Sequence, residues 1–110
     1  MATEEQPLEV LRDEACEKLA GIKIESCSAF WDEEGEVVVV GEVATISGRS
    51  MSDYAEVHVA VHAAGGRLLA AETVHLGKVG IRKVFETSLE PRGRGAVPAS
   101  VRVYPIRDDN

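Results

Sequence analysis

The stretch from Glu36 to Leu76 constrains the fold most, because it gathers runs of β-branched residues broken only by glycines and short polar segments. Val57, Val59 and Val61 alternate with polar or small residues, which is the period of a strand with one buried face. Gly65 and Gly66 follow, and glycine adopts positive φ at little steric cost. The pattern therefore predicts a β-hairpin that turns at these two glycines.

The hairpin also predicts a register for the returning chain. If Gly65 and Gly66 are the two turn residues, the expected pairs are Ala64 with Arg67, Val61 with Ala70, Val57 with Val74, and Glu56 with His75. The apolar residues of both strands then share one face, and Glu72 is the one residue that does not fit it.

Four further strands are predicted from alternation or apolar runs, at residues 22–30, 37–46, 81–89 and 97–104. Gly41 interrupts the second of these and indicates a bulge or a close approach of another segment. Residues 77–80 are interpreted as a second turn and residues 47–53 as a connecting loop, with a binding loop as the alternative. Pro105 is expected to end the last strand or to leave it at an edge.

Residues 3–20 are predicted to form a helix, with Thr3 and Gln6 as a capping box and Gly21 just past its end. Its apolar stripe has helical spacing and consists of Leu8, Leu11, Ala15 and Leu19. We expect this helix to cover the end or edge of a sheet, and the alternative is a helix that docks to a partner.

Six strands at short spacing, with no helix between them, favour an all-β fold. The predicted architecture is an antiparallel immunoglobulin-like β-sandwich of about six to seven strands with one N-terminal α-helix. The chain then divides into an N-terminal helix at 1–20, a sandwich domain at 21–107 and a C-terminal tail at 108–110.

The charge distribution limits the partners that we expect. The 110 residues carry a formal net charge of −7, and residues 1–42 hold 12 acidic and 3 basic side chains. Phosphate binding requires clustered Lys and Arg, so nucleic acid is not the expected partner. The acidic N-terminus and the lack of a long apolar run predict no signal peptide, no membrane span and a cytoplasmic location.

The core of the chain resembles the small bacterial and archaeal β-sandwich domains of the FxLYD type over roughly residues 37–103. The resemblance is carried by fold-specifying positions, which are Gly41, Val43, Val57, Val59, Val61, Gly66, Gly80 and Phe85. His62 and Ala63 stand where that family has its name-giving aromatic and aspartate. The resemblance implies an accessory or binding module without a reaction or a cofactor.

The sequence offers no catalytic motif, and we expect no enzyme, cofactor or metal site. His58 and His62 lie four residues apart, which on a strand separates them by about 13 Å, too far to share one ion. Glu56 and His75 are predicted to form a cross-strand pair on the polar face, with a catalytic or metal role as the alternative. Cys16 and Cys27 are interpreted as reduced, partly buried thiols on a helix and a strand.

The candidate partner-binding residues are basic and lie around the turns that flank the strand at 81–89. They are Lys78, Arg82, Lys83, Arg92 and Arg94. The leading hypothesis is a non-catalytic interaction or accessory module that binds another protein. The alternatives are self-assembly into a homo-oligomer, and salt-sensitive binding of a ligand or nucleic acid through this basic region.

Overall fold

The computed structural model describes residues 5–93 and 95–108, which form seven strands and one short helix. The elements are β1 (Gln6–Arg12), α1 (Glu14–Ala20), β2 (Ile22–Trp31), β3 (Val37–Thr45), β4 (Met51–Ala63), β5 (Leu68–Gly80), β6 (Arg82–Leu89) and β7 (Pro98–Asp108). The predicted all-β class, with about seven strands and an N-terminal helix, is therefore confirmed.

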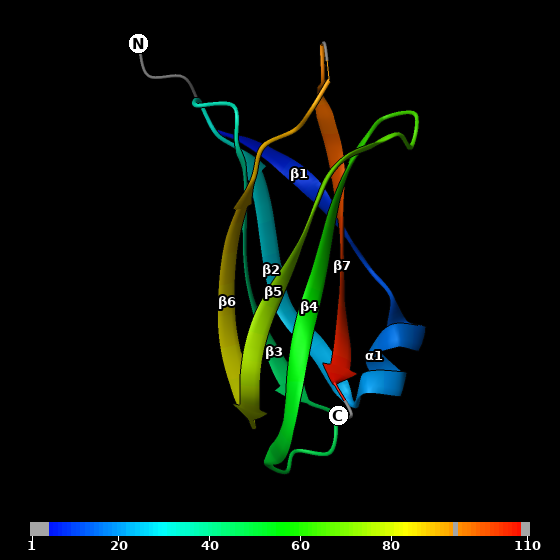
Figure 1. Ribbon diagram of the computed structural model, residues 1–110, viewed down its shortest axis with the longest axis vertical. Coiled ribbons are helices and arrows are strands. Elements are labelled where there is room, and N and C mark those ends of the chain that lie inside the picture. Colours follow the sequence, from blue (N-terminus) through cyan, green and yellow to red (C-terminus); the bar gives the residue numbers. More distant parts are fainter. Residues whose placement is uncertain (1–4, 94, 109–110) are drawn as a thin grey trace.

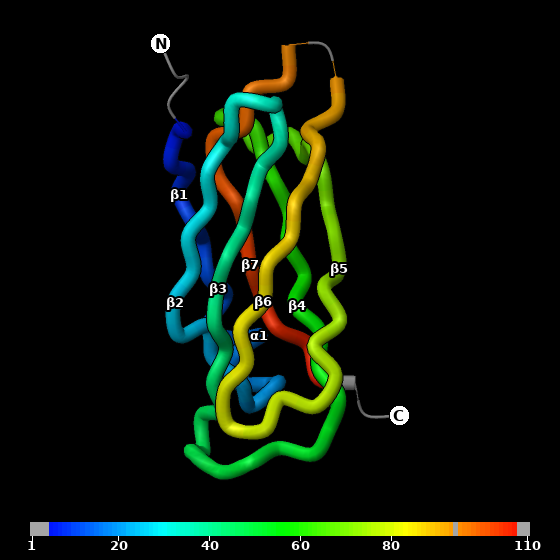
Figure 2. Tube along the Cα trace, turned by 90° about the vertical axis from the view of Figure 1, so that its left-hand side faces the viewer, coloured from blue at the N-terminus to red at the C-terminus, as the bar shows by residue number. Residues whose placement is uncertain are grey.

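The strands follow the order β5-β4-β7-β1-β2-β3-β6 and curl into a sheet that nearly closes on itself. One wall holds β2, β3 and β6, the other holds β7, β4 and β5, and β1 bridges them by pairing with both β2 and β7 (Figures 1 and 2). The prediction of a purely antiparallel arrangement is wrong at one point, because β1 and β7 run parallel. Parallel neighbours need a long connection, and nearly the whole chain lies between these two strands.

The immunoglobulin-like sandwich is not confirmed by this arrangement. In an immunoglobulin domain the second strand pairs with the fifth. Here β2 pairs with β3, and β3 then pairs with β6. The likeness to FxLYD-type domains stays a prediction.

The N-terminal segment differs most from its prediction, because residues 6–12 form β1 and only Glu14–Ala20 are helical. Leu8 and Val10 pack against the core while Glu9 between them is exposed, so the segment has the period of a strand. Two paired strands, β2 and β7, override the helical spacing that the isolated sequence suggests. The helix predicted for residues 3–20 therefore ends where expected but begins too early in the prediction.

Asp13 caps the start of the helix α1, because its side chain accepts a hydrogen bond from the backbone N–H of Cys16 at 3.1 Å. It ends at Gly21 with φ 73°, as predicted. Gln6 lies in β1 and Thr3 lies outside the described residues, so the predicted capping box does not start this helix. Leu19, expected in the buried stripe, is 82% exposed.

The core lies between the two walls and consists largely of valines that alternate along the strands. Val57, Val59 and Val61 of β4 are buried as predicted, and Val101 and Val103 of β7 lie beside them. The other fully buried valines are Val37, Val39 and Val43 of β3. Burying so much aliphatic surface supplies the main force that holds the two walls together.

The register of the β4–β5 hairpin is confirmed for three of its four predicted pairs, namely Glu56 with His75, Val57 with Val74 and Val61 with Ala70. The pair of Ala64 with Arg67 is wrong. The N–H of Ala63 donates to the Arg67 carbonyl at 2.9 Å, which leaves a three-residue loop with Gly66 at φ 91°. The pairing slips by one residue after Val61 to accommodate this longer loop.

Three strands extend well beyond their predicted ends, and one of them, β4, begins at Met51, inside the predicted loop at 47–53. Residues 77–80 belong to β5, where a bulge beside Leu76 takes the place of the expected turn. Strand β7 continues through the buried Pro105 to Asp108, so residue 108 belongs to the strand and not to the expected tail at 108–110, of which residues 109–110 lie outside the described part. Beyond Val103, β7 pairs with β4 on one side only, and a proline without an N–H is tolerated there.

Candidate protein-interaction surfaces

The predicted basic residues divide between the two ends of the molecule. Lys78, Arg82 and Lys83 lie near the turn that joins β5 to β6. Arg92 follows the far end of β6, where its N–H donates to the Leu69 carbonyl at 3.0 Å. Arg94 lies outside the described residues. The eight residues of β6 separate the two ends by about 25 Å, so these side chains do not form one cluster.

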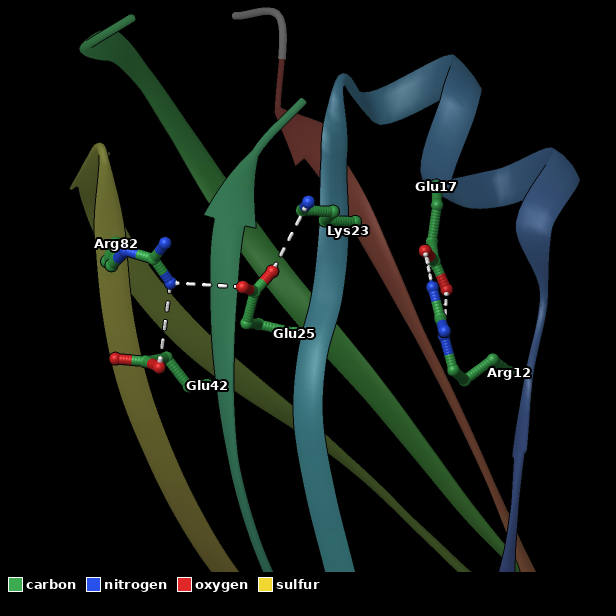
Figure 3. Close-up of polar contacts among 6 residues, drawn as sticks. All are labelled: Arg12, Glu17, Lys23, Glu25, Glu42 and Arg82. Carbon is green, nitrogen blue, oxygen red and sulfur yellow. Dashed lines mark hydrogen bonds and ion pairs between the residues drawn. The ribbon is translucent and has the colours of Figure 1, made fainter. Parts of the chain in front are cut away.

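Arg82 is already engaged with carboxylates of its own chain (Figure 3). Its guanidinium lies 3.3 Å from Glu25 and 3.9 Å from Glu42, and Lys23 lies 3.4 Å from Glu25. The hydrogen bond from Arg82 and then that from Lys23 hold the pKa of Glu25 below its ordinary value. Arg82 therefore has less charge to offer a partner than the sequence suggests.

A second surface gathers both tyrosines and all three histidines of the chain on the outer side of one wall. Because Val57, Val59 and Val61 point into the core, the residues between them point outward. The cross-strand pairs add residues of β5 and β7 to this side. We name this surface the tyrosine–histidine face, and it consists of Tyr54, Glu56, His58, Ala60, His62, Ala71, Thr73, His75, Lys78, Arg102, Tyr104 and Ile106.

One carboxylate joins two histidines at the centre of this face. Glu56 Oε2 lies 3.0 Å from His75 Nδ1, so the predicted cross-strand pair is confirmed, and Glu56 Oε1 lies 3.5 Å from His58 Nε2. The His58 ring also packs against Tyr104, with centroids 5.3 Å apart and planes inclined by 32°. These contacts fix the side chains on an otherwise flat surface.

The small residues of the face leave a shallow hollow between the rings. Its volume is about 310 Å³, and it is lined by His58, Val59, Ala60, Ala71, Glu72, Thr73, His75 and Tyr104. Tyr54 is 57% exposed and Ile106 37% exposed on the same side. Exposed tyrosine and aliphatic side chains around a hollow are typical of protein interfaces.

Within the described residues, neither His58 nor His75 is hydrogen-bonded to a hydroxyl or a thiol, which is the pairing that activates a nucleophile. Within residues 5–93 and 95–108, no three His, Cys, Asp or Glu side chains are grouped to hold a metal ion. His58 and His62 lie on one strand, four residues apart.

Sequence analysis missed Tyr54 and Tyr104 as members of a site. Tyr104 meets His58 only because β7 pairs with β4, and no local pattern predicts that pairing. The outward position of Tyr54 does follow from the alternation that continues from Val57 back to Ala55. The two tyrosines are therefore a signal that becomes visible once the strand order is known.

The two cysteines occupy the predicted elements, Cys16 on α1 and Cys27 on β2, and both are free thiols of intermediate exposure. Burial raises the pKa of Cys27 to about 11. Desolvation, followed by the hydrogen bond with Asp13, also raises the pKa of Cys16. Thiols held in the protonated form are poor nucleophiles.

We expect Cys27 to make the protein less stable as the pH rises from 9 to 11. The unfolded thiol ionises near its ordinary pKa of 9.0, whereas the folded thiol stays protonated up to about 11. The unfolded state thus releases its proton first and is favoured in this window. Urea denaturation at pH 8, 9 and 10 measures the loss, and the variant Cys27→Ala is expected to lose less stability than the wild type.

Alkylation gives a second measure of the raised pKa of Cys27. At pH 8 the folded Cys27 should hold about a hundredfold less thiolate than an ordinary cysteine, since its pKa is about two units higher. Iodoacetamide should therefore modify Cys27 slowly in the native protein and rapidly in urea. Equal rates in the two conditions would contradict the raised pKa.

Of the residues that the structure describes, none belongs to a helix with the length and apolar character needed to cross a bilayer. Comparison of the chain with protein families, with curated proteins and with solved structures found no match.

Proposed function

We propose that this protein is a non-catalytic interaction module that binds another protein through its tyrosine–histidine face. The observation that carries the proposal is the gathering of both tyrosines and all three histidines on one face, where His58, His75 and Tyr104 line a hollow. Aromatic side chains are enriched at the energetically dominant positions of interfaces, and they lose little conformational entropy on binding.

The charges of the face support a protein partner. Glu56, the carboxylate at its centre, already contacts two histidines, and Glu72 lines the hollow at the β5 side. Lys78 and Arg102 also belong to this face. Of the basic residues predicted to bind a partner, Lys78 is therefore the one that lies on the proposed interface. The alternative of nucleic-acid binding is less favoured, because Arg92 lies at the opposite end from Lys78 and Arg82.

Self-assembly, membership of FxLYD-type or immunoglobulin-like domains, and a cytoplasmic location remain predictions.

Site-specific photocrosslinking in the native host tests this proposal. A photoreactive phenylalanine analogue at Tyr54 is expected to give one dominant crosslinked protein, which the Tyr104→Ala variant reduces at least tenfold. The matched control is the same analogue at Val84, which is 70% exposed on the opposite wall. Crosslinks that are equally strong from both positions, or that survive the loss of Tyr104, would contradict the proposal.

A further inference from the structure

The sheet stays open along a seam between its two outer strands, β5 and β6. The two strands are consecutive in the chain, yet within the described residues no pairing joins them. Figure 1 shows them meeting at their common turn and diverging toward the other end. Apart from the Leu69 carbonyl, which accepts from the Arg92 N–H, the backbone groups on these two edges have no strand partner among the described residues and can receive a further strand.

A groove lies at the wider part of this seam and has a volume of about 400 Å³. Ala70, Ala71 and Ser88 line it with small side chains, so an incoming backbone can approach the strand edges closely. The loop after β6 limits the groove at its far end, because Arg92 is bonded there to the Leu69 carbonyl. The space therefore suits a short extended segment.

The groove is lined by two carboxylates, Glu72 and Glu90, and by one basic residue, Arg92, so acidic groups predominate. Glu72 pairs with the buried Val59 and so lies on the core-facing side of β5, but its carboxylate has no ion pair or hydrogen bond with any described residue. Glu36 precedes Val37, and Val37 pairs with Leu89, which lines the groove.

An inward-pointing charge on an edge strand prevents association with apolar strands, including those of a second copy. The same carboxylate is stabilised by a Lys or Arg that an incoming segment places opposite it. The net charge of −7 also favours the encounter with a basic partner.

We infer that the seam between β5 and β6 is a second binding site, which takes a short, basic, extended segment of a partner protein by strand addition. The segment bonds to the open edge of β5 or β6 through its backbone and directs a Lys or Arg side chain toward Glu72. This site adjoins the tyrosine–histidine face, because Ala71 and Glu72 line both hollows, but its open strand edges belong to β5 and β6 alone.

Selection from a phage-displayed library of random 12-residue peptides tests the inference. The enriched peptides are expected to carry Lys or Arg at alternating positions. When a selected peptide is bound, amide hydrogen exchange should slow in β5 or β6. Failure to enrich such peptides, or protection confined to other strands, would overturn the inference.

Charge variants separate a specific contact from general attraction. Glu72→Lys is expected to weaken binding of the selected peptide at least tenfold, whereas Glu9→Lys, an equal charge change at an exposed position of β1, should leave it within twofold. Equal losses in both variants would overturn the inference. Tyr104→Ala should not change peptide binding, so a failure of this site and a failure of the tyrosine–histidine face can be told apart.

Discussion

The variant Arg12→Ala is expected to lose about 2–4 kcal/mol of unfolding free energy, because it leaves a buried carboxylate without its partner. Glu17 of α1 is only 3% exposed. Both of its oxygens accept hydrogen bonds from the Arg12 guanidinium, at 2.6 Å and 3.0 Å, as Figure 3 shows. These bonds also raise the pKa of Arg12. The exposed half of the Arg12 side chain lets water reach the site, which keeps the loss below that of a fully enclosed pair.

The expected loss is a large part of the 5–15 kcal/mol or so that stabilises a typical domain. Urea denaturation followed by the fluorescence of the single tryptophan, Trp31, measures it. The control is the double variant Arg12→Met with Glu17→Met, which removes both charges and should recover most of the stability. A loss below about 0.5 kcal/mol for Arg12→Ala would show that water already solvates Glu17.

The second large effect is expected at Gly41, where the variant Gly41→Ala should cost about 2–3 kcal/mol. A Cβ atom at this position would lie 2.6 Å and 2.8 Å from the Phe85 ring and 2.9 Å from the Ser26 carbonyl oxygen. The ring can move, but the carbonyl belongs to the neighbouring strand β2 and is held by the sheet. The strain therefore falls partly on the backbone.

The matched control is Gly65→Ala, because nothing lies within 4 Å of that Cβ position and Gly65 does not have positive φ. Thermal unfolding of the two variants should separate them clearly. If the ring contact dominates, adding Phe85→Leu to Gly41→Ala should cost less than the sum of the two single changes. Equal melting temperatures for Gly41→Ala and Gly65→Ala would contradict the close approach.

Local patterns predicted the parts of the fold that depend on neighbours in sequence. The β4–β5 hairpin follows from alternation and two glycines, and with it the Glu56–His75 pair. Of the two readings of Gly41, a bulge or a close approach, the structure confirms the close approach, and the approaching residue is Phe85. In each case a single position carries a backbone requirement that glycine meets.

The errors arise where distant strands decide the structure. Leu8 and Leu11 have a spacing that suits a helix, yet pairing with β2 and β7 makes the segment a strand. The stack of Tyr104 on His58 depends in the same way on the β4–β7 pairing. The basic residues were predicted to form one group because the two turns that carry them are close in sequence. Those turns lie at opposite ends of β6, so the residues are separated in space.

The parallel pairing of β1 with β7 has a consequence for how the protein is made. Strand β7 is synthesised after the other six strands, yet it lies between β1 and β4 in the finished sheet. Until β7 leaves the ribosome, the edges of β1 and β4 that will receive it stay open, and the two walls are not yet joined on that side. Long-range pairing of this kind slows folding and exposes edges that can aggregate. The domain therefore completes its sheet only after its last strand has been translated.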